Sequence, residues 1–306
     1  MSNASAVGAK AREGQTFSGE STFARWMSFV KLPHTVFALP FALVGVTLAS
    51  KLAPISLGML GWVVLAFTSA RWVAMAVNRI VDREFDAQNP RTAQREIPRG
   101  AIRVRDAWLT VVVAAALFVW AAAQLNPLCL YLSPVALAWV CFYSFTKRFT
   151  RYAHLVLGLG LAIAPVGGFL AVTGLWSEPW WMLIALTVAV MTWSGGFDVL
   201  YALPDVEFDR SQGLHSIPAA VGVPRAVAIA RLLHVTTVLA LAATVWVTGG
   251  GWFAWAGVAT AAVLLGYEHS LVKSDDLSKL DAAFFTMNGV ISMTFFAWML
   301  LDRIFG

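Results

Sequence analysis

Stretches of about 20 mostly apolar residues recur along almost the whole chain, and they constrain the fold more than any other feature. A helix of that length crosses the hydrocarbon core of a bilayer. Because a chain in lipid must satisfy its own backbone hydrogen bonds, we expect an all-α, polytopic membrane protein with nine transmembrane helices in one bundle. The expected spans are residues 29–49, 56–78, 105–124, 127–145, 153–174, 178–198, 224–247, 251–268 and 281–302.

Composition supports a membrane protein and argues against a soluble one. The chain is 59% hydrophobic and only 13% charged, whereas a soluble domain is nearer half apolar and a quarter charged. Residues 1–21 are polar and contain no apolar region leading to a cleavage site, so we expect a disordered tail there and a single domain over 22–306. Cys129 and Cys141 match no metal-ligand spacing and are interpreted as small apolar residues.

The lysine and arginine residues predict the orientation of the bundle. Given the nine spans, most of the 22 Lys and Arg residues lie in the N-terminal segment and in the connections after even-numbered spans. This asymmetry places the N-terminus and those connections in the cytoplasm, as in a bacterial-type inner membrane. The net charge of +5 is spread between spans, so we expect the lipid bilayer as partner and no nucleic acid.

Two groups of oxygen-bearing side chains occur in the two longest connections, both on the expected cytoplasmic side. The first is Asn78, Asp82 and Asp86 in "NRIVDREFD", and the second is Asp198, Tyr201, Asp205 and Asp209 in "DVLYALPDVEFD". Residues four apart share one face of a helix. Apposed carboxylates repel unless a cation lies between them, and hard oxygen ligands suit Mg2+ completed by water and phosphate. The pattern predicts a cytoplasmic-side cavity in which Mg2+ holds a diphosphate. The alternative is that both groups only cap helices.

Three cations point to the same cavity. Lys147 lies one helical turn after Tyr143, where its ammonium would neutralise a departing diphosphate or would simply anchor the helix at the interface. Arg71 lies two turns deeper than Asn78, where a lone charge is a functional hypothesis by default. It would bind an acceptor's carboxylate or the diphosphate, or form a structural ion pair. Lys31 would line the mouth of the cavity, or extend along apolar surface to the interface.

The motifs together resemble the UbiA-type intramembrane prenyltransferases. "NRIVDREFDAQNPRT" is similar to the first NxxxDxxxD-type motif of that family, "DVEFD" to the second DxxxD motif and "YSFTK" to the YxxxK element between them. The resemblance covers nearly the whole chain, in the family's order. "HTVFALPFA", "NPRTAQREIPRG" and "GLHSIPAAVG" look most like the branch that prenylates aromatic acids, namely 4-hydroxybenzoate polyprenyltransferases and menaquinone-pathway enzymes acting on 1,4-dihydroxy-6-naphthoate.

The resemblance implies Mg2+-dependent transfer of a polyprenyl group from polyprenyl diphosphate to a ring carbon of an aromatic acid, in ubiquinone or menaquinone biosynthesis. It also implies the residue roles. Mg2+ would be held by Asn78, Asp82, Asp86, Asp205 and Asp209, and phosphate oxygens by Lys147, Tyr143, Arg79 and Arg83. Asp198 would lie on the metal side or position substrate. Many relatives have Asn-Asp at the start of the first motif, and Arg79 here leaves the metal ligand set open.

Other functions remain open at this point. One is prenyl transfer to a non-quinone acceptor. Another is a Mg2+ transporter, although both acidic connections lie on one expected face and supply no matched site on the other.

Overall fold

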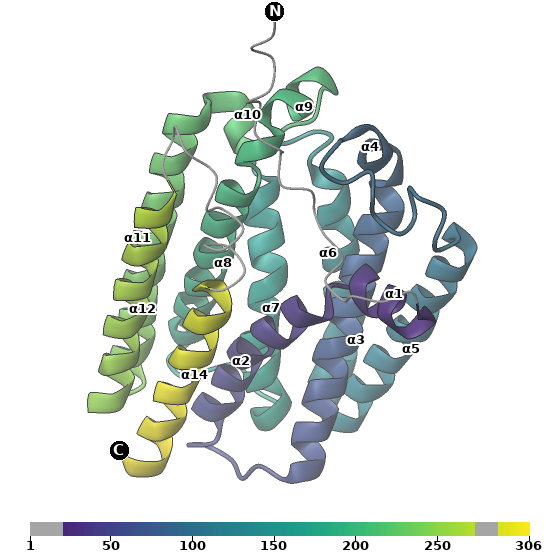
Figure 1. The fold of residues 1–306 in the computed structure, drawn as a ribbon. Coiled ribbons are helices and arrows are strands. Elements are labelled where there is room, and N and C mark those ends of the chain that lie inside the picture. Colours follow the sequence, from purple (N-terminus) through teal and green to yellow (C-terminus); the bar gives the residue numbers. More distant parts are fainter. Residues whose placement is uncertain (1–20, 273–286) are drawn as a thin grey trace, which may run out of the picture.

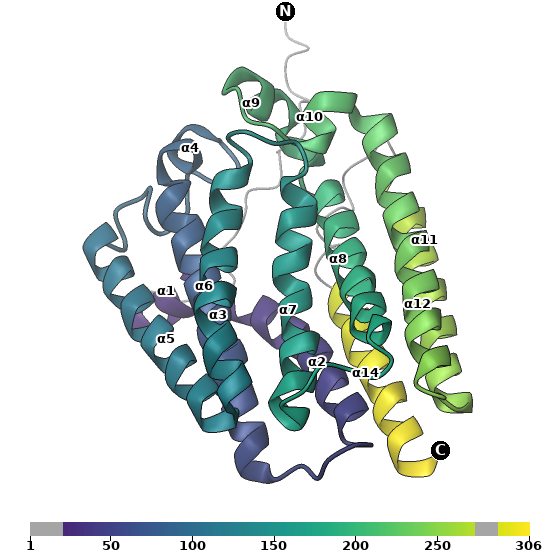
Figure 2. The same cartoon turned by 180° about the vertical axis from the view of Figure 1, so that it is seen from behind.

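The computed structural model describes residues 21–272 and 287–306, and within these ranges the chain forms helices and no strands. Figures 1 and 2 show most of the long helices side by side, from α5 and α3 at one edge to α11 and α12 at the other. The helices are α1 (Thr22–Phe29), α2 (Leu32–Ala49), α3 (Leu57–Val81), α4 (Arg83–Gln88), α5 (Val104–Leu125), α6 (Pro127–Thr146), α7 (Ala153–Thr173), α8 (Trp181–Tyr201), the 3-10 helix η1 (Leu203–Asp205), α9 (Val206–Ser211), α10 (Ile217–Val221), α11 (Val223–Val247), α12 (Trp252–Leu271) and α14 (Asn288–Phe305).

Six of the described helices are long and apolar enough to cross a membrane: α3, α5, α6, α7, α8 and α11. In α2 the apolar part, Ala38–Ala49, is shorter. The helices α12 and α14 coincide with the expected spans 251–268 and 281–302, but neither is among the six, and residues 281–286 lie outside the described residues. The all-helical, membrane-spanning class is confirmed, whereas the count of nine stays a prediction.

The start of the first expected span differs from the structure. The span was expected to begin at residue 29, but α1 ends there and the chain turns at Val30 and Lys31, where Lys31 has a φ of 49°. The next helix, α2, begins at Leu32 with a proline in its first turn, which is compatible with a helix start. Trp26 of α1 stacks on Trp72 of α3 at 6.4 Å between ring centroids. The expected tail lies almost entirely in residues 1–20, outside the described residues.

Two of the three hydrophobic cores found among the described residues join the long helices. One contains Phe41, Phe169, Leu186, Leu241 and Phe295, from α2, α7, α8, α11 and α14. The other contains Phe29, Val73, Ile80 and Val111, from α1, α3 and α5, and Val140 from α6.

Glycines let α2 and α7 touch through their backbones. A Cβ added to Gly45 would lie 1.9 Å from the carbonyl oxygen of Pro165, and one added to Gly168 would lie 2.2 Å from that of Ala42. No larger residue fits at either position, and small residues at such crossings are typical of membrane helix pairs. This contact fixes one wall of the bundle.

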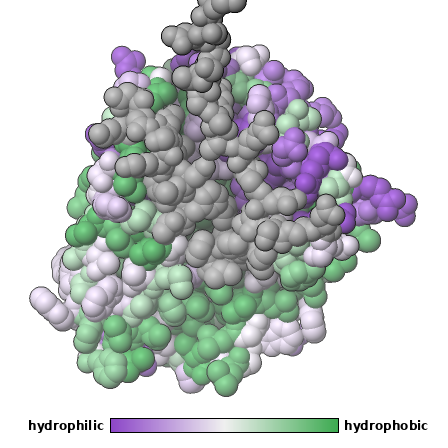
Figure 3. Space-filling view, viewed as in Figure 1, coloured by the Kyte–Doolittle hydropathy of each residue, from purple (hydrophilic) through white to green (hydrophobic). Residues whose placement is uncertain are grey.

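The polar segments gather at one end of the bundle. In Figures 1 and 2 the short helices α4, α9 and α10 lie at the same end. Figure 3 shows hydrophilic side chains around α4 and mostly hydrophobic ones toward the opposite end. Leu109 and Val113 on α5 and Leu239 and Trp246 on α11 are exposed apolar side chains, as expected for helices that face lipid.

Candidate active site

A polar cavity of about 210 Å³ lies at the end of the bundle that carries α4 and α9. It is lined by almost every side chain that the sequence assigned to the site, although the two acidic motifs are far apart in the chain. Its charged lining consists of Asp82, Asp86, Asp198, Asp205 and Asp209, with Lys31, Arg71, Arg79, Arg91, Arg95 and Lys147. Asn78, Tyr143 and Tyr201 also line it.

Arg83 is the exception among the predicted residues. Its side chain is 41% exposed, and its Nη2 lies 2.6 Å from Oε1 of the surface residue Glu84. Its Nη1 donates to the carbonyl oxygen of Ile80 at 3.0 Å. The structure therefore does not bring Arg83 together with the other predicted phosphate ligands.

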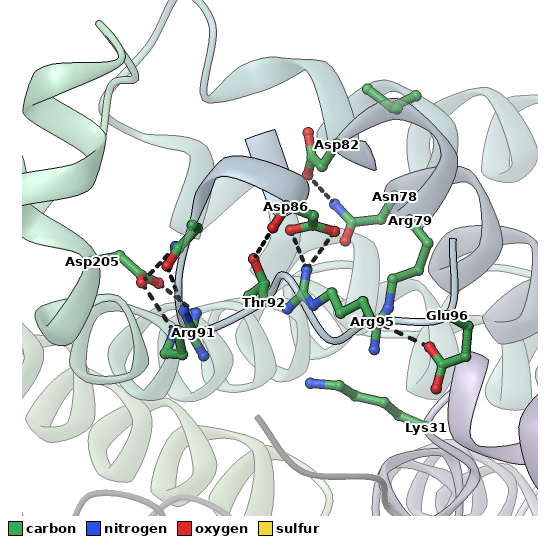
Figure 4. A network of polar contacts seen from close by, with 12 residues as sticks. Lys31, Asn78, Arg79, Asp82, Asp86, Arg91, Thr92, Arg95, Glu96 and Asp205 are labelled. Carbon is green, nitrogen blue, oxygen red and sulfur yellow. Dashed lines mark hydrogen bonds and ion pairs between the residues drawn. The ribbon is translucent and has the colours of Figure 1, made fainter. Parts of the chain in front are cut away.

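The first acidic motif crosses the junction between α3 and α4. Asp82 takes a non-helical ψ of 3° between them, but the bonds from the Asp82 N–H to the Asn78 carbonyl (2.9 Å) and from the Asp86 N–H to the Asp82 carbonyl (2.8 Å) keep the four-residue repeat. Asn78 Nδ2 donates to Asp82 Oδ2 at 2.9 Å (Figure 4). Burial and the neighbouring Asp86 raise the pKa of Asp82, against the opposing charges of Lys147 and Arg148.

The second motif does not form one helix, so the expectation of a single helical face is wrong for residues 198–209. The chain leaves α8 after Tyr201 and passes through η1, which has Pro204 in its first turn, before α9 begins. Even so, Asp198, Asp205 and Asp209 all line the cavity. Burial raises the pKa of Asp209 despite the nearby Lys147. Burial alone would do the same to Asp205, but its hydrogen bonds and ion pair with Arg91 lower its pKa.

Arginines of the segment after α4 join the two acidic motifs. Arg95 Nη1 donates to both carboxylate oxygens of Asp86, at 2.7 and 2.9 Å, while Arg91 pairs with Asp205 (Figure 4). Asn89 Nδ2 also donates to Asp205 Oδ1, at 3.0 Å. The cations beside these two carboxylates are thus arginine side chains, which allow the two motifs to face each other without a metal ion. Arg91 and Arg95 lie in "NPRTAQREIPRG", a stretch that contributes to the predicted topology and to the family resemblance but predicts no role in the site for either residue.

Lys147 lies among the carboxylates of the second acidic motif. Burial alone would lower the pKa of Lys147, but the carboxylates of Asp209, Asp198 and Asp205 raise it. No hydrogen bond or ion pair of the Lys147 Nζ is found within the described part of the chain, so the ammonium is available to a ligand.

Arg71, Lys31 and Arg79 differ in their contacts. Arg71 Nε is buried without a hydrogen-bond partner among the described residues. Lys31 is only 7% exposed, with Nζ 3.5 Å from the Tyr201 hydroxyl, so it does not extend to the interface. Arg79 is buried beside Glu96, with Nη1 3.9 Å from Oε2, which makes a carboxylate its partner in the structure.

A second, apolar cavity of about 490 Å³ lies between α2, α3, α5, α6, α7 and α8. Its walls include Phe41, Phe67, Trp139 and Trp193. The two cavities have four lining residues in common, which are Arg71, Tyr143, Leu157 and Leu161. The polar cavity thus adjoins the apolar one at Arg71 and Tyr143.

The donor set fits Mg2+ bound together with a phosphate ligand. Among the described residues no three His, Cys, Asp or Glu side chains converge on one metal position. Mg2+ is commonly held by one or two carboxylates, with water and substrate phosphate completing its octahedron. Asp209 Oδ2 is buried without a partner in the described chain, beside a cavity whose other oxygen donors come from both motifs. These residues fit a site in which substrate phosphate completes the coordination of Mg2+ better than a site in which every ligand comes from the protein.

The fold and the two adjoining cavities define a membrane-embedded protein in which a charged chamber opens onto an apolar one. The chain belongs to the UbiA prenyltransferase family, whose model matches residues 38–299, and the prediction of a prenyltransferase is confirmed.

Individual relatives agree with this assignment. The chain is 29% identical to a 4-hydroxybenzoate octaprenyltransferase of Citrobacter koseri, over 75% of this chain and 79% of that one. The apo structure of a UbiA homolog from Aeropyrum pernix K1 is similar with 33% identity and a TM-score of 0.81, over 88% and 98% of the two chains. A UbiA homolog from Archaeoglobus fulgidus, solved with GPP and Mg2+, shares the fold at 20% identity and a TM-score of 0.71, over 92% and 99%.

Proposed function

We propose that this protein transfers a polyprenyl group from polyprenyl diphosphate to a ring carbon of an aromatic acid of the 4-hydroxybenzoate type, in a Mg2+-dependent reaction of quinone biosynthesis. The observation that carries the proposal is the junction of the two cavities at Arg71 and Tyr143. A prenyl diphosphate has the matching shape, because its charged head and its apolar tail meet at one carbon atom. The names of the relatives support the acceptor class.

The polar cavity would bind the diphosphate. Lys147, with its raised pKa and no protein partner in the described chain, is placed to bind phosphate oxygens. Asp82, Asp86, Asp205 and Asp209, with Asn78, would hold Mg2+. When bound, Mg2+ would neutralise the diphosphate and so make it a better leaving group. Arg91 and Arg95 line the same cavity and are further candidates for phosphate contacts.

The apolar cavity would receive the prenyl tail and keep water from the reacting carbon. As the allylic C1–O bond lengthens, positive charge develops at C1, and water at that point would give an alcohol. Walls of Phe41, Phe67, Trp139 and Trp193 exclude water. A ring carbon of the acceptor then bonds to C1 as the C1–O bond breaks and diphosphate leaves, and that ring carbon afterwards loses its proton to a base.

Arg71 is the residue that we assign to the acceptor's carboxylate. Its Nε is buried without a partner among the described residues, and its side chain lines both cavities. A guanidinium binds a carboxylate through two parallel hydrogen bonds. That contact would place the aromatic ring where the two cavities meet, beside C1 of the prenyl donor.

The orientation in the membrane is part of the proposal. We infer nine spans, with the N-terminus and the site on the cytoplasmic side of a bacterial-type inner membrane. The segments around α4 and α9, which carry the site, gather at one end of the bundle (Figure 1), and they contain many of the chain's arginines. Donor and acceptor would then enter from the cytoplasm or from lipid.

One assay tests the proposal. Purified protein in detergent is given Mg2+ and geranyl diphosphate, with 4-hydroxybenzoate and 1,4-dihydroxy-6-naphthoate in separate reactions. We expect one of the two to be prenylated on a ring carbon, and only when Mg2+ is present. Product from neither acceptor overturns the acceptor class, and Mg2+ flux in liposomes without product would favour a transporter.

A further inference from the structure

His154 lies next to the polar cavity but belongs to none of the motifs that identified the site. It is in the first turn of α7 and is fully buried, at 0% exposure. Its Nδ1 is 2.7 Å from Oδ2 of Asp198 on α8. Its Nε2 is 3.3 Å from the backbone nitrogen of Ile217, where α10 begins. The imidazole thus connects a side chain of the cavity to a backbone group outside it.

These two contacts fix the tautomer of the ring. The backbone N–H of Ile217 is a donor only, so Nε2 must accept and cannot carry a proton. The proton of the neutral ring is then on Nδ1 and is donated to the Asp198 carboxylate. Asp198 Oδ1 has no partner among the described residues, and the side chain, 21% exposed, lines the polar cavity. Asp198 therefore presents one acceptor-only oxygen to the cavity.

The segment that Ile217 belongs to also contacts two other residues of the site. The backbone N–H of His215 donates to the carbonyl oxygen of Lys147 at 2.7 Å. The side chain of Ser216, which is fully buried, lies close enough to Asp209 to oppose the rise in the pKa of that carboxyl. Three consecutive residues thus contact Lys147, Asp209 and His154.

We propose that His154 is a positioning residue whose Nδ1–H holds the Asp198 carboxylate so that its Oδ1 accepts a hydrogen bond from the hydroxyl group of the aromatic acceptor. The inference rests on the proposed function, because the acceptor class supplies the hydroxyl. A carboxylate held by an imidazole N–H has a fixed orientation. Arg71, which lines the same cavity, would bind the carboxylate of the same acceptor.

Two substitutions separate the contacts of the ring. In His154→Asn the side-chain amide lies near the position of Nδ1 and still donates to Asp198. In His154→Gln the amide reaches the position of Nε2, so the bond to Ile217 survives and the bond to Asp198 is lost. We expect the acceptor KM of His154→Gln to rise about 10- to 100-fold, and that of His154→Asn to stay within about threefold of wild type. The donor KM should stay unchanged in both variants.

A purely structural role would give a different result. Equal changes in the two variants, or parallel changes in donor and acceptor KM, overturn the proposal. Thermal unfolding in detergent shows whether each variant is folded. Nitrogen NMR of the histidines in the wild-type protein gives a test that needs no folded variant. We expect a neutral His154 with its proton on Nδ1, and a proton on Nε2 would overturn the proposal.

Failure of the proposed role of His154 can be distinguished from failure of the proposed function. If wild-type protein prenylates neither aromatic acid, the function fails, whatever the variants do. If wild-type protein is active and His154→Gln matches it, only the role of His154 fails.

Discussion

Arg95 Nη1 lies 2.7 Å from Oδ1 and 2.9 Å from Oδ2 of Asp86, and this single donor contacts both oxygens of the carboxylate. Arg91, four residues earlier, pairs with Asp205 of the other acidic motif. One short segment therefore neutralises a carboxylate from each side of the polar cavity. A diphosphate would compete for the same two guanidinium groups.

Removing either arginine should destabilise the protein. Arg91→Gln and Arg95→Gln each leave a mostly buried carboxylate without its partner, which costs about 3–5 kcal/mol. Thermal unfolding in detergent measures the loss. Arg103→Gln is the matched control, because Arg103 pairs with Asp106 but is 84% exposed, so a change of at most about 1 kcal/mol is expected. Equal losses in all three variants would contradict this account.

The carboxylates of Asp82 and Asp205 should be essential for transfer. Because Asp205 is the ion partner of Arg91, Asp205→Asn should also lose stability, which thermal unfolding in detergent measures separately. Asp82→Asn and Asp205→Asn each remove one charged oxygen ligand, and we expect Mg2+-dependent turnover to fall at least about 100-fold, equivalent to about 2.7 kcal/mol. Glu84→Gln is the control, since Glu84 is two residues from Asp82 but its side chain is 74% exposed. Near wild-type turnover in Asp82→Asn or Asp205→Asn would remove that residue from the site.

Lys147 should contribute to binding of the donor. Lys147→Met removes the ammonium, and we expect the donor KM to rise about 10- to 100-fold with little change in acceptor KM. Because its neighbours raise its pKa above the ordinary 10.5, the ammonium stays charged below that pH. The ratio of mutant to wild-type donor KM should therefore be constant between about pH 6 and 9. Arg151→Met, on the exposed surface four residues later, should leave both KM values unchanged.

Arg71 should discriminate between the two substrates. If its guanidinium binds the acceptor's carboxylate, Arg71→Leu raises the acceptor KM by about 10-fold or more while the donor KM changes little. Steady-state kinetics with each substrate varied in turn measures both. A matched rise in the two values would assign Arg71 to the diphosphate or to the packing of α3.

Gly167 allows a direct test of the tail cavity. It lines that cavity, and a Cβ added there would meet nothing within 4 Å. Gly167→Leu should therefore fill the cavity without displacing the backbone, and the KM for long-chain donors should rise about 10-fold more than that for dimethylallyl diphosphate. Gly61→Leu, equally open but outside the cavity on exposed α3 surface, is the control. An equal effect on short and long donors would place the tail elsewhere.

Much of the lining of the candidate site could be predicted, because residues spaced four apart in the sequence stay on one side of the chain in the structure. Asn78, Asp82 and Asp86 keep their four-residue repeat across the end of α3, and Lys147 lies on the same cavity as expected. Arg83 could not be placed correctly from sequence. It is next to Asp82 in the chain, but the turn between α3 and α4 directs its side chain to Glu84 at the surface.

For other residues of the cavity, no pattern in the sequence predicts which side chains they contact. His154 belongs to no motif, and only the packing of α7 against α8 brings it to Asp198. Arg91 and Arg95 were visible as charges, but nothing in the sequence predicts which carboxylate each one meets. Asp205, the partner of Arg91, is 114 residues away, and Asp86, the partner of Arg95, is 9 residues away across the end of α4.

The sequence by itself determined that the chain is helical and lies in a membrane, because runs of apolar residues of that length have no other stable fold in lipid. It also determined which ligand chemistry is available, since oxygen donors and cations recur where the apolar runs end. Tertiary structure alone decided which carboxylate meets which cation and where the polar cavity joins the apolar one. Those relationships depend on how helices that are far apart in the sequence pack against one another. That packing is set by side-chain volumes, and the lack of a side chain at Gly45 and Gly168 lets α2 and α7 cross closely.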